Sequence, residues 1–234
     1  MTDTAIGSFE AHAPEYNALR RKLIPPFDRF YGAATEAVGF AGNQPRRILD
    51  LGAGTGLLAL AFAPRVREVL AVDISSAMCA YLRQVSRARG VDNLEVLCGS
   101  ADQLPVPSEC ADLIVSSYCF HHLNDRAKRV ALNHVFRALR PGGRFVIADM
   151  MFRISLRTER DRVIVLGAIV KLLRKGPAGI IRILKNVLRW ATRRWEYPAG
   201  PDWWAAALRN SGFEDVVVMP LDHEGGIAVG VRRG

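Results

Sequence analysis

The chain has 234 residues, 50% of them hydrophobic, and a formal net charge of +9. This length suits one domain with a full core, so folding requires no disulfide or metal staple. Its four cysteines, Cys79, Cys98, Cys110 and Cys119, form no C-x-x-C pair. The spacing argues against a disulfide framework or a cysteine metal site, and it favours reduced core residues.

The basic charge is concentrated in one segment. Residues 153–194 hold 12 Lys and Arg against two acids, whereas the rest of the chain holds 20 against 21 acids. No apolar run approaches the ~20 residues of a membrane span, and the first 16 residues lack the pattern of a secretory signal. We therefore expect a cytoplasmic protein whose excess positive charge acts through this segment.

The amino-terminal residues 9–39 are predicted to be helical. Aromatic and aliphatic side chains, among them Tyr16 and Phe27, recur at helical spacing, and Pro25-Pro26 interrupts the pattern. The simplest interpretation is a leader that docks on the body of the protein through its aromatic side chains.

Residues 48–56, Ile-Leu-Asp-Leu-Gly-Ala-Gly-Thr-Gly, predict a buried strand, a glycine turn and the start of a helix. Gly52 can adopt the positive φ of a tight turn, and Gly54 and Gly56 remove Cβ atoms that would hold a bulky ligand away from the helix N-terminus. A dinucleotide fingerprint would need a third glycine at position 57, where this chain has Leu57. The turn therefore disfavours a nicotinamide dinucleotide.

Two acidic residues indicate which class of ligand the turn binds. Asp50 precedes the turn, where it would repel a pyrophosphate and attract a sulfonium or ammonium group. Asp73 ends the next apolar strand, residues 69–72, about twenty residues beyond the first glycine, the spacing at which an acid reaches a ribose diol. With these acids and the three glycines, residues 48–150 resemble the class I S-adenosylmethionine-dependent methyltransferases.

The resemblance implies an α/β fold of Rossmann-like type. We expect a seven-stranded, mostly parallel sheet with helices on both faces, the last strand antiparallel and a helical lid inserted after strand five. One methyltransferase domain is expected over residues 1–234. Its expected parts are a helical leader (1–40), a cofactor-binding core (41–150), a basic lid (151–200) and a C-terminal helix and strand pair (201–234).

S-adenosyl-L-methionine is the implied cofactor. Asp102 matches the family's acid that accepts a hydrogen bond from the adenine amino group, although it could instead cap its own polar loop, residues 99–105. Tyr16 and Arg20 of the leader are candidates for the methionine end. The other positions expected to contact the cofactor are Ala53, Thr55, Ile74, Met78, Ala101, Gln103, Ser116 and Ser117.

The acceptor side is predicted at the end of the fourth strand, residues 111–117, because ligands bind beyond strand ends where the strand order reverses. Tyr118, His122 and Trp195 are candidates for substrate binding. His121 and His122 are candidate general bases, since an imidazole titrates near neutral pH, although either histidine could be structural. Their spacing predicts no metal site.

The basic segment, residues 153–195, supports three interpretations. It could be a lid with a solvated basic surface, it could contact an anionic membrane or admit a greasy acceptor, or it could bind RNA through arginines and stacked aromatic side chains. Residues 225–231 resemble the tail of ubiquinone and menaquinone methyltransferases, whereas residues 20–28 resemble the leader of transfer-RNA wobble-uridine modifying relatives.

These likenesses lead to one expected function and two alternatives. We expect O- or C-methylation of a small, largely apolar acceptor, quinone-like or a secondary metabolite. The first alternative is a transfer-RNA-modifying methyltransferase that uses the basic lid. The second is a cofactor-binding module without turnover, or a nicotinamide oxidoreductase. Nothing in the sequence predicts the oligomeric state.

Overall fold

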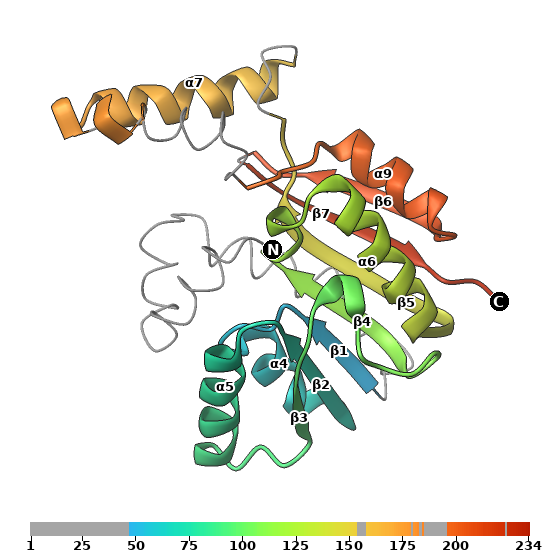
Figure 1. Cartoon of the computed structure of the whole chain (residues 1–234). Helices are drawn as coiled ribbons and strands as arrows, with labels where there is room; N and C mark the ends of the chain where they lie inside the picture. The colour runs from blue at the N-terminus through green and yellow to red at the C-terminus, as the bar shows by residue number, and fades with distance from the viewer. Residues whose placement is uncertain (1–46, 154–157, 179, 183, 185–195, 223) are drawn as a thin grey trace.

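A computed structural model describes residues 47–153, 158–178, 180–182, 184, 196–222 and 224–234. Within these residues, seven strands form one sheet in the order β3-β2-β1-β4-β5-β7-β6 (Figure 1). Every neighbouring pair is parallel except β5–β7 and β6–β7, so β7 alone runs against the others. The expected sheet is confirmed, whereas the leader with Tyr16 and Arg20, and also Trp195, lie outside the described residues.

The first half of the sheet alternates strands with helices. Its elements are β1 (Arg47–Leu51), α4 (Leu57–Phe62), the short helix η2 (Ala63–Arg65), β2 (Glu68–Asp73), α5 (Ser76–Ala88) and β3 (Leu94–Cys98). Ser75 caps α5, because its hydroxyl accepts a hydrogen bond from the Met78 N–H.

The second half continues the alternation and then inserts helices. Its elements are η3 (Ala101–Gln103), β4 (Ala111–Ser117), η4 (Phe120–His122), α6 (Asp125–Ala138), β5 (Leu139–Met150), α7 (Glu159–Leu173), α9 (Pro201–Asn210), β6 (Glu214–Pro220) and β7 (Gly225–Val231). The sequence predicts that β5 begins at Arg144, but Leu139 already pairs with Ala111 across a bulge, so the strand starts where α6 ends.

The core lies on both faces of the sheet, as a mostly parallel sheet requires. One cluster packs α6 and α9 against the sheet, and the other packs α4 and α5 against the opposite face. Trp204 of α9 and Phe62 of α4 are among the largest fully buried side chains. The expected helices on both faces are therefore confirmed.

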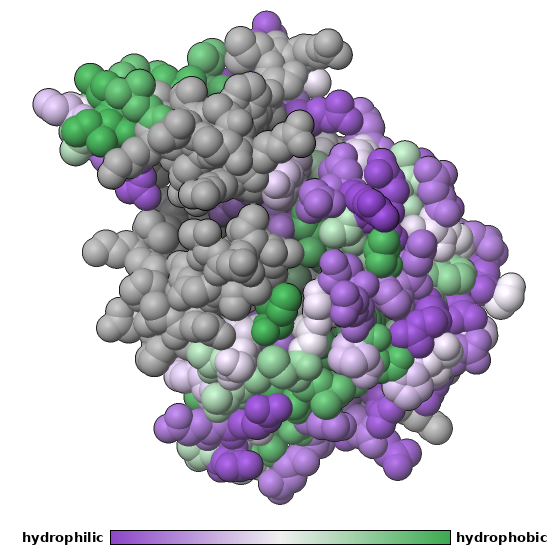
Figure 2. Space-filling view, viewed as in Figure 1, coloured by the Kyte–Doolittle hydropathy of each residue, from purple (hydrophilic) through white to green (hydrophobic). Residues whose placement is uncertain are grey.

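α7 follows β5, where the helical insertion was predicted. Its apolar side chains are exposed: Val163 at 64%, Leu166 at 50% and Leu173 at 50%. Figure 2 shows a hydrophobic area at the end of the molecule that carries α7. Among the residues described, no helix combines the length and the apolar character needed to cross a bilayer.

Candidate active site

A cleft opens at the carboxyl ends of β1, β2 and β4, where the strand order reverses between β1 and β4. It is open to solvent and spans about 860 Å³, counting the open part. Predicted positions that line it are Asp50, Gly52, Ala53, Gly54, Thr55, Asp73, Ile74, Met78, Ala101, Ser117, Tyr118 and His122.

The glycine turn is fixed against the neighbouring strand. The N–H groups of Gly52 and Ala53 donate to the Val72 carbonyl of β2 at 2.8 and 3.1 Å. Gly52 has φ +76°, and a Cβ at this position would lie 2.3 Å from the Cys119 sulfur. Both its backbone conformation and its close approach to the end of β4 therefore require glycine.

Asp50 is a buried acid at the floor of this cleft. Its side chain is 1% exposed, and its carboxylate accepts a hydrogen bond from the Ala59 N–H at 2.9 Å. Burial raises the pKa of Asp50 to about 7, and the hydrogen bond from Ala59 offsets only part of that rise. A cation bound in the cleft would stabilise the ionised form, so this site favours a positively charged ligand.

Asp73 holds the turn and faces the same cleft. Its carboxylate accepts hydrogen bonds from the N–H groups of Gly54 at 2.7 Å and Ser75 at 2.9 Å. Burial raises the pKa of Asp73, and these hydrogen bonds oppose the rise. A carboxylate offers about four acceptor sites, so the side chain keeps capacity for a ribose hydroxyl.

The opposite wall of the cleft is formed by the residues after β4. Tyr118 has a positive φ of 50°, which is strained for a non-glycine residue, and its side chain is 5% exposed. Its ring packs edge-on against His121 with centroids 5.8 Å apart. His122 lines the cleft one turn further along, in η4. The two histidines therefore differ: His122 faces the cleft, whereas His121 is 4% exposed behind it.

His121 is held by a second buried acid, Asp149 at the end of β5. The His121 Nδ1 lies 2.6 Å from one carboxylate oxygen of Asp149. The other oxygen accepts hydrogen bonds from the N–H groups of Cys119, Phe120 and His121. Burial alone would raise the pKa of Asp149, but the His121 imidazole, the N–H of Met150 and the nearby His122 hold it below its usual value. The acid is therefore ionised at neutral pH and orients the imidazole.

Some predicted site residues have structural contacts instead. Ser116 is 2% exposed, and its hydroxyl donates to the Leu51 carbonyl of β1 at 2.7 Å. Gly56 has φ +81°, and a Cβ there would lie 2.1 Å from Leu82, so it is required by helix packing rather than by ligand approach. Asp102 accepts a hydrogen bond from the Ser100 hydroxyl, the contact expected of a loop-capping acid.

Five predicted site residues do not line the described cleft: Ser116, Gly56, Asp102, His121 and the exposed Gln103. The cleft instead includes residues that the sequence analysis did not single out, among them Leu57, Leu58, Ser100, Cys119 and Leu123. Burial raises the pKa of the Cys119 thiol, so this cysteine is a neutral wall residue and not a nucleophile. Asp149 was also missed, although an acid ending a buried strand beside β4 was the available signal.

The comparisons with known proteins agree with this geometry. Residues 48–143 match the family model described as a methyltransferase domain. Residues 48–143 therefore form a methyltransferase domain. The matched residues cover β1 to the start of β5, which is the part of the fold that forms the cleft.

Two relatives and one solved structure illustrate the similarity. The uncharacterized methyltransferase YcgJ of Bacillus subtilis is 39% identical over 103 residues, 44% of this chain and 40% of its own. The ubiquinone/menaquinone biosynthesis C-methyltransferase UbiE of Vibrio vulnificus is 32% identical over 146 residues, 60% of this chain and 55% of its own. The chain thus spans about half the length of the curated relatives it matches.

The structural neighbour is phosphoethanolamine N-methyltransferase 2 of Haemonchus contortus in complex with S-adenosyl-L-methionine. It superposes with a TM-score of 0.67 at 15% identity, covering 88% of this chain and 53% of the neighbour. At this identity the likeness shows the fold. The cofactor of the domain is S-adenosylmethionine, and the buried Asp50 beside a glycine-rich turn fits a sulfonium cation attached to adenosine.

Proposed function

We propose that the protein transfers a methyl group from S-adenosylmethionine to a small, largely apolar acceptor, quinone-like or a secondary metabolite, at oxygen or carbon. One observation carries the proposal: a single cleft is lined by Asp50 and Asp73 on one side and by Tyr118 and His122 on the other. The similarity to a protein named as a ubiquinone/menaquinone C-methyltransferase supports this acceptor class.

The cofactor supplies an already activated methyl group, so the protein has to align the acceptor, exclude water and remove a proton. Asp73 would hold the ribose diol, and Asp50 would face the cationic end of the ligand. His122 lines the cleft and is the residue that we assign to proton removal from an acceptor hydroxyl or acidic ring carbon. His121, behind it, would orient the loop through Asp149.

Ligand-induced thermal stabilisation tests the proposal. S-adenosylmethionine and S-adenosylhomocysteine should each raise the melting temperature, because a ligand at 100 times its Kd stabilises the folded state by about 2.7 kcal/mol. NAD should leave the melting temperature unchanged. The variant Asp73→Ala should lose this rise in melting temperature. The variant His122→Ala should keep the rise but should no longer transfer labelled methyl into an organic extract of the expression host. A folded wild-type protein that shows no shift with either compound would refute the cofactor assignment.

A transfer-RNA substrate is the second candidate, and the basic segment favours it. Residues 153–194 carry the whole positive excess of the chain. Binding to phosphates would weaken steeply with salt because condensed counterions are released. If transfer of labelled methyl to transfer RNA falls by orders of magnitude between about 50 and 200 mM salt, while quinols accept none, the RNA assignment replaces the small-molecule one.

We also propose that α7 and the residues after it contact an anionic membrane surface that holds an apolar acceptor. Ile180 and Leu184 are 50% and 64% exposed, and they add to the exposed apolar side chains of α7. Arg174, Lys175 and Arg182 are exposed in the same region. Apolar side chains beside cations are the composition of a peripheral membrane contact.

Vesicle flotation tests this contact. Wild-type protein should float with vesicles that contain phosphatidylglycerol and less with pure phosphatidylcholine. The double variant Val163→Gln, Leu166→Gln should lose most of this binding, whereas the matched control Val217→Gln, which changes a side chain 51% exposed on β6, should keep it. Equal flotation of both variants would contradict the proposal.

A further inference from the structure

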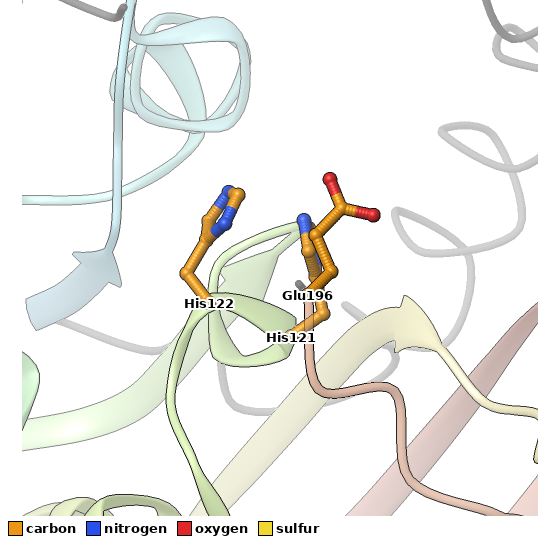
Figure 3. A group of neighbouring side chains, drawn as sticks. All are labelled: His121, His122 and Glu196. Atoms are coloured by element: carbon orange, nitrogen blue, oxygen red, sulfur yellow. The ribbon is translucent and has the colours of Figure 1, made fainter. Parts of the chain in front are cut away.

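Three side chains with metal-ligating atoms meet at η4, and one of them, His122, also lines the cleft. His121, His122 and Glu196 each offer one ligand atom, and these atoms lie within 4.8 Å of one another. Figure 3 shows the three side chains extending to the same side of the ribbon, the histidines from η4 and the glutamate from the segment before α9. The two imidazole rings have centroids 4.0 Å apart.

The contact with Asp149 orients the His121 ring in a way that suits coordination of a metal ion. The Asp149 carboxylate lies 2.6 Å from Nδ1, so in the tautomer in which Nδ1 donates to it, the Nε2 lone pair points away from the acid. Metal-ligating histidines commonly donate their second N–H to a carboxylate in this way, which fixes the tautomer and raises the basicity of the ligating nitrogen. The Asp149–His121 pair is therefore an independent sign of a ligating imidazole.

Glu196 is held beside the histidines by backbone contacts. The next residue, Tyr197, donates its N–H to the His121 carbonyl at 2.6 Å. The fully buried Lys128 donates to the Tyr197 carbonyl and, at 2.7 Å, to the Leu123 carbonyl. These bonds attach the chain beside Glu196 to His121 of η4 and to Leu123, which follows η4, so the glutamate is positioned by the fold although its side chain is exposed.

We propose that His121, His122 and Glu196 bind a divalent first-row transition-metal ion, with Zn²⁺ as the reference ion. Two imidazoles and one carboxylate are a common zinc donor set, and imidazole disfavours Mg²⁺. Bonds of about 2.1 Å at tetrahedral angles separate ligand atoms by about 3.4 Å. The ligands therefore have to approach by at most about 1.4 Å from the present 4.8 Å, which rotation of the exposed Glu196 and half-buried His122 side chains can provide.

The ion would leave at least one coordination position for a ligand from the cleft, because three protein ligands do not complete a tetrahedral shell. His122 also lines that cleft, so an acceptor oxygen could occupy the position. Bound there, the oxygen would be more acidic, so its proton would pass to solvent water, and His122 would act as a ligand of the ion and not as the base. Metal binding itself does not depend on methyl transfer and is tested separately from it.

Zinc titration of the tag-free, chelator-stripped protein tests the site. One Zn²⁺ per chain should bind in competition with a chromophoric chelator, and Co²⁺ should give visible absorption bands typical of nitrogen and oxygen ligands. His122→Ala and Glu196→Gln should each weaken Zn²⁺ binding at least tenfold, and Asp149→Asn should weaken it by about 10- to 100-fold. The controls His134→Ala and Glu95→Gln should leave the affinity unchanged.

Two results would overturn the proposal: no stoichiometric Zn²⁺ or Co²⁺ binding, or binding that His122→Ala and Glu196→Gln leave intact. Glu196 is exposed, so its substitution should preserve the fold, and thermal unfolding checks this for every variant. The stabilisation by S-adenosylhomocysteine is measured on the same samples. A protein that binds S-adenosylhomocysteine but no metal refutes this inference alone, and a protein that binds metal but not S-adenosylhomocysteine refutes the proposed function alone.

Discussion

Replacing Asp50 with asparagine isolates the charge at the floor of the cleft. Asparagine has nearly the same shape as aspartate, and its carbonyl oxygen can accept the hydrogen bond that the Ala59 N–H now donates to Asp50 at 2.9 Å. The substitution therefore removes the ionisation of a buried acid and preserves its packing. Its effect on the unliganded protein and its effect on cofactor binding should have opposite signs.

The unliganded variant should be more stable than the wild type. Burial raises the pKa of Asp50 from 3.8 to about 7, so between these values the folded state binds a proton that the unfolded state has released. Wild-type stability therefore falls as pH rises through this window, and the loss is complete above the folded pKa. A shift of this size corresponds to at most about 4 kcal/mol. The advantage of Asp50→Asn should grow from about pH 4 to about pH 7 and then stay constant.

The liganded variant should lose affinity, because the sulfonium and ammonium groups of the cofactor stabilise an ionised Asp50. In the wild type, binding should release a proton near neutral pH, which calorimetry in buffers of different ionisation enthalpy measures. Asp50→Asn should bind without that release.

Urea unfolding from about pH 4 to about pH 8.5 measures the stability difference, with the exposed Glu95→Gln as control. A variant that is no more stable at high pH, or that binds the cofactor with the same affinity and proton release, would refute the electrostatic role of Asp50.

Three further predictions concern the frame of the site. Gly56→Ala should destabilise the fold by several kcal/mol in urea unfolding, because its φ is +81° and the new Cβ would lie 2.1 Å from Leu82. Ser116→Ala should cost about 1–3 kcal/mol by leaving the Leu51 carbonyl unpaired, with no change in cofactor affinity by calorimetry. Burial lowers the pKa of Lys128 from 10.5 to about 8, so wild-type stability should rise between these pH values by about 3 kcal/mol relative to Lys128→Met.

The strands and the glycine turn could be predicted because local patterns specify them. The run of residues 48–51 is apolar apart from Asp50, and it is followed by glycines at three alternate positions. This combination is typical of a buried strand that ends in a tight turn. Asp73 was placed correctly because it ends a short apolar strand, and strand ends meet at one edge of a parallel sheet.

The partners of individual side chains could not be predicted in the same way. Ser116 and Ser117 are adjacent in β4, and alternation sends one to the Leu51 carbonyl and the other to the cleft, a choice that depends on the strand's register beside β1. Glu196 stands 74 positions beyond His122 in the chain. Contacts of Tyr197 with His121 and Lys128 bring it to the histidines, so no spacing in the sequence indicates that cluster.

The cleft also concentrates free-energy costs that the fold alone does not require. Asp50 is a buried acid that forms no ion pair with any of the described residues, and Tyr118 has a positive φ of 50°, a conformation that costs on the order of 1–3 kcal/mol. Both lie at the carboxyl ends of β1 and β4, on either side of the reversal in strand order. A cationic ligand would offset the first cost, whereas the second directs Tyr118 and the residues after it around the cleft. The unfavourable terms are therefore located where cofactor and acceptor would meet, which is the arrangement expected of a site organised for binding rather than for stability.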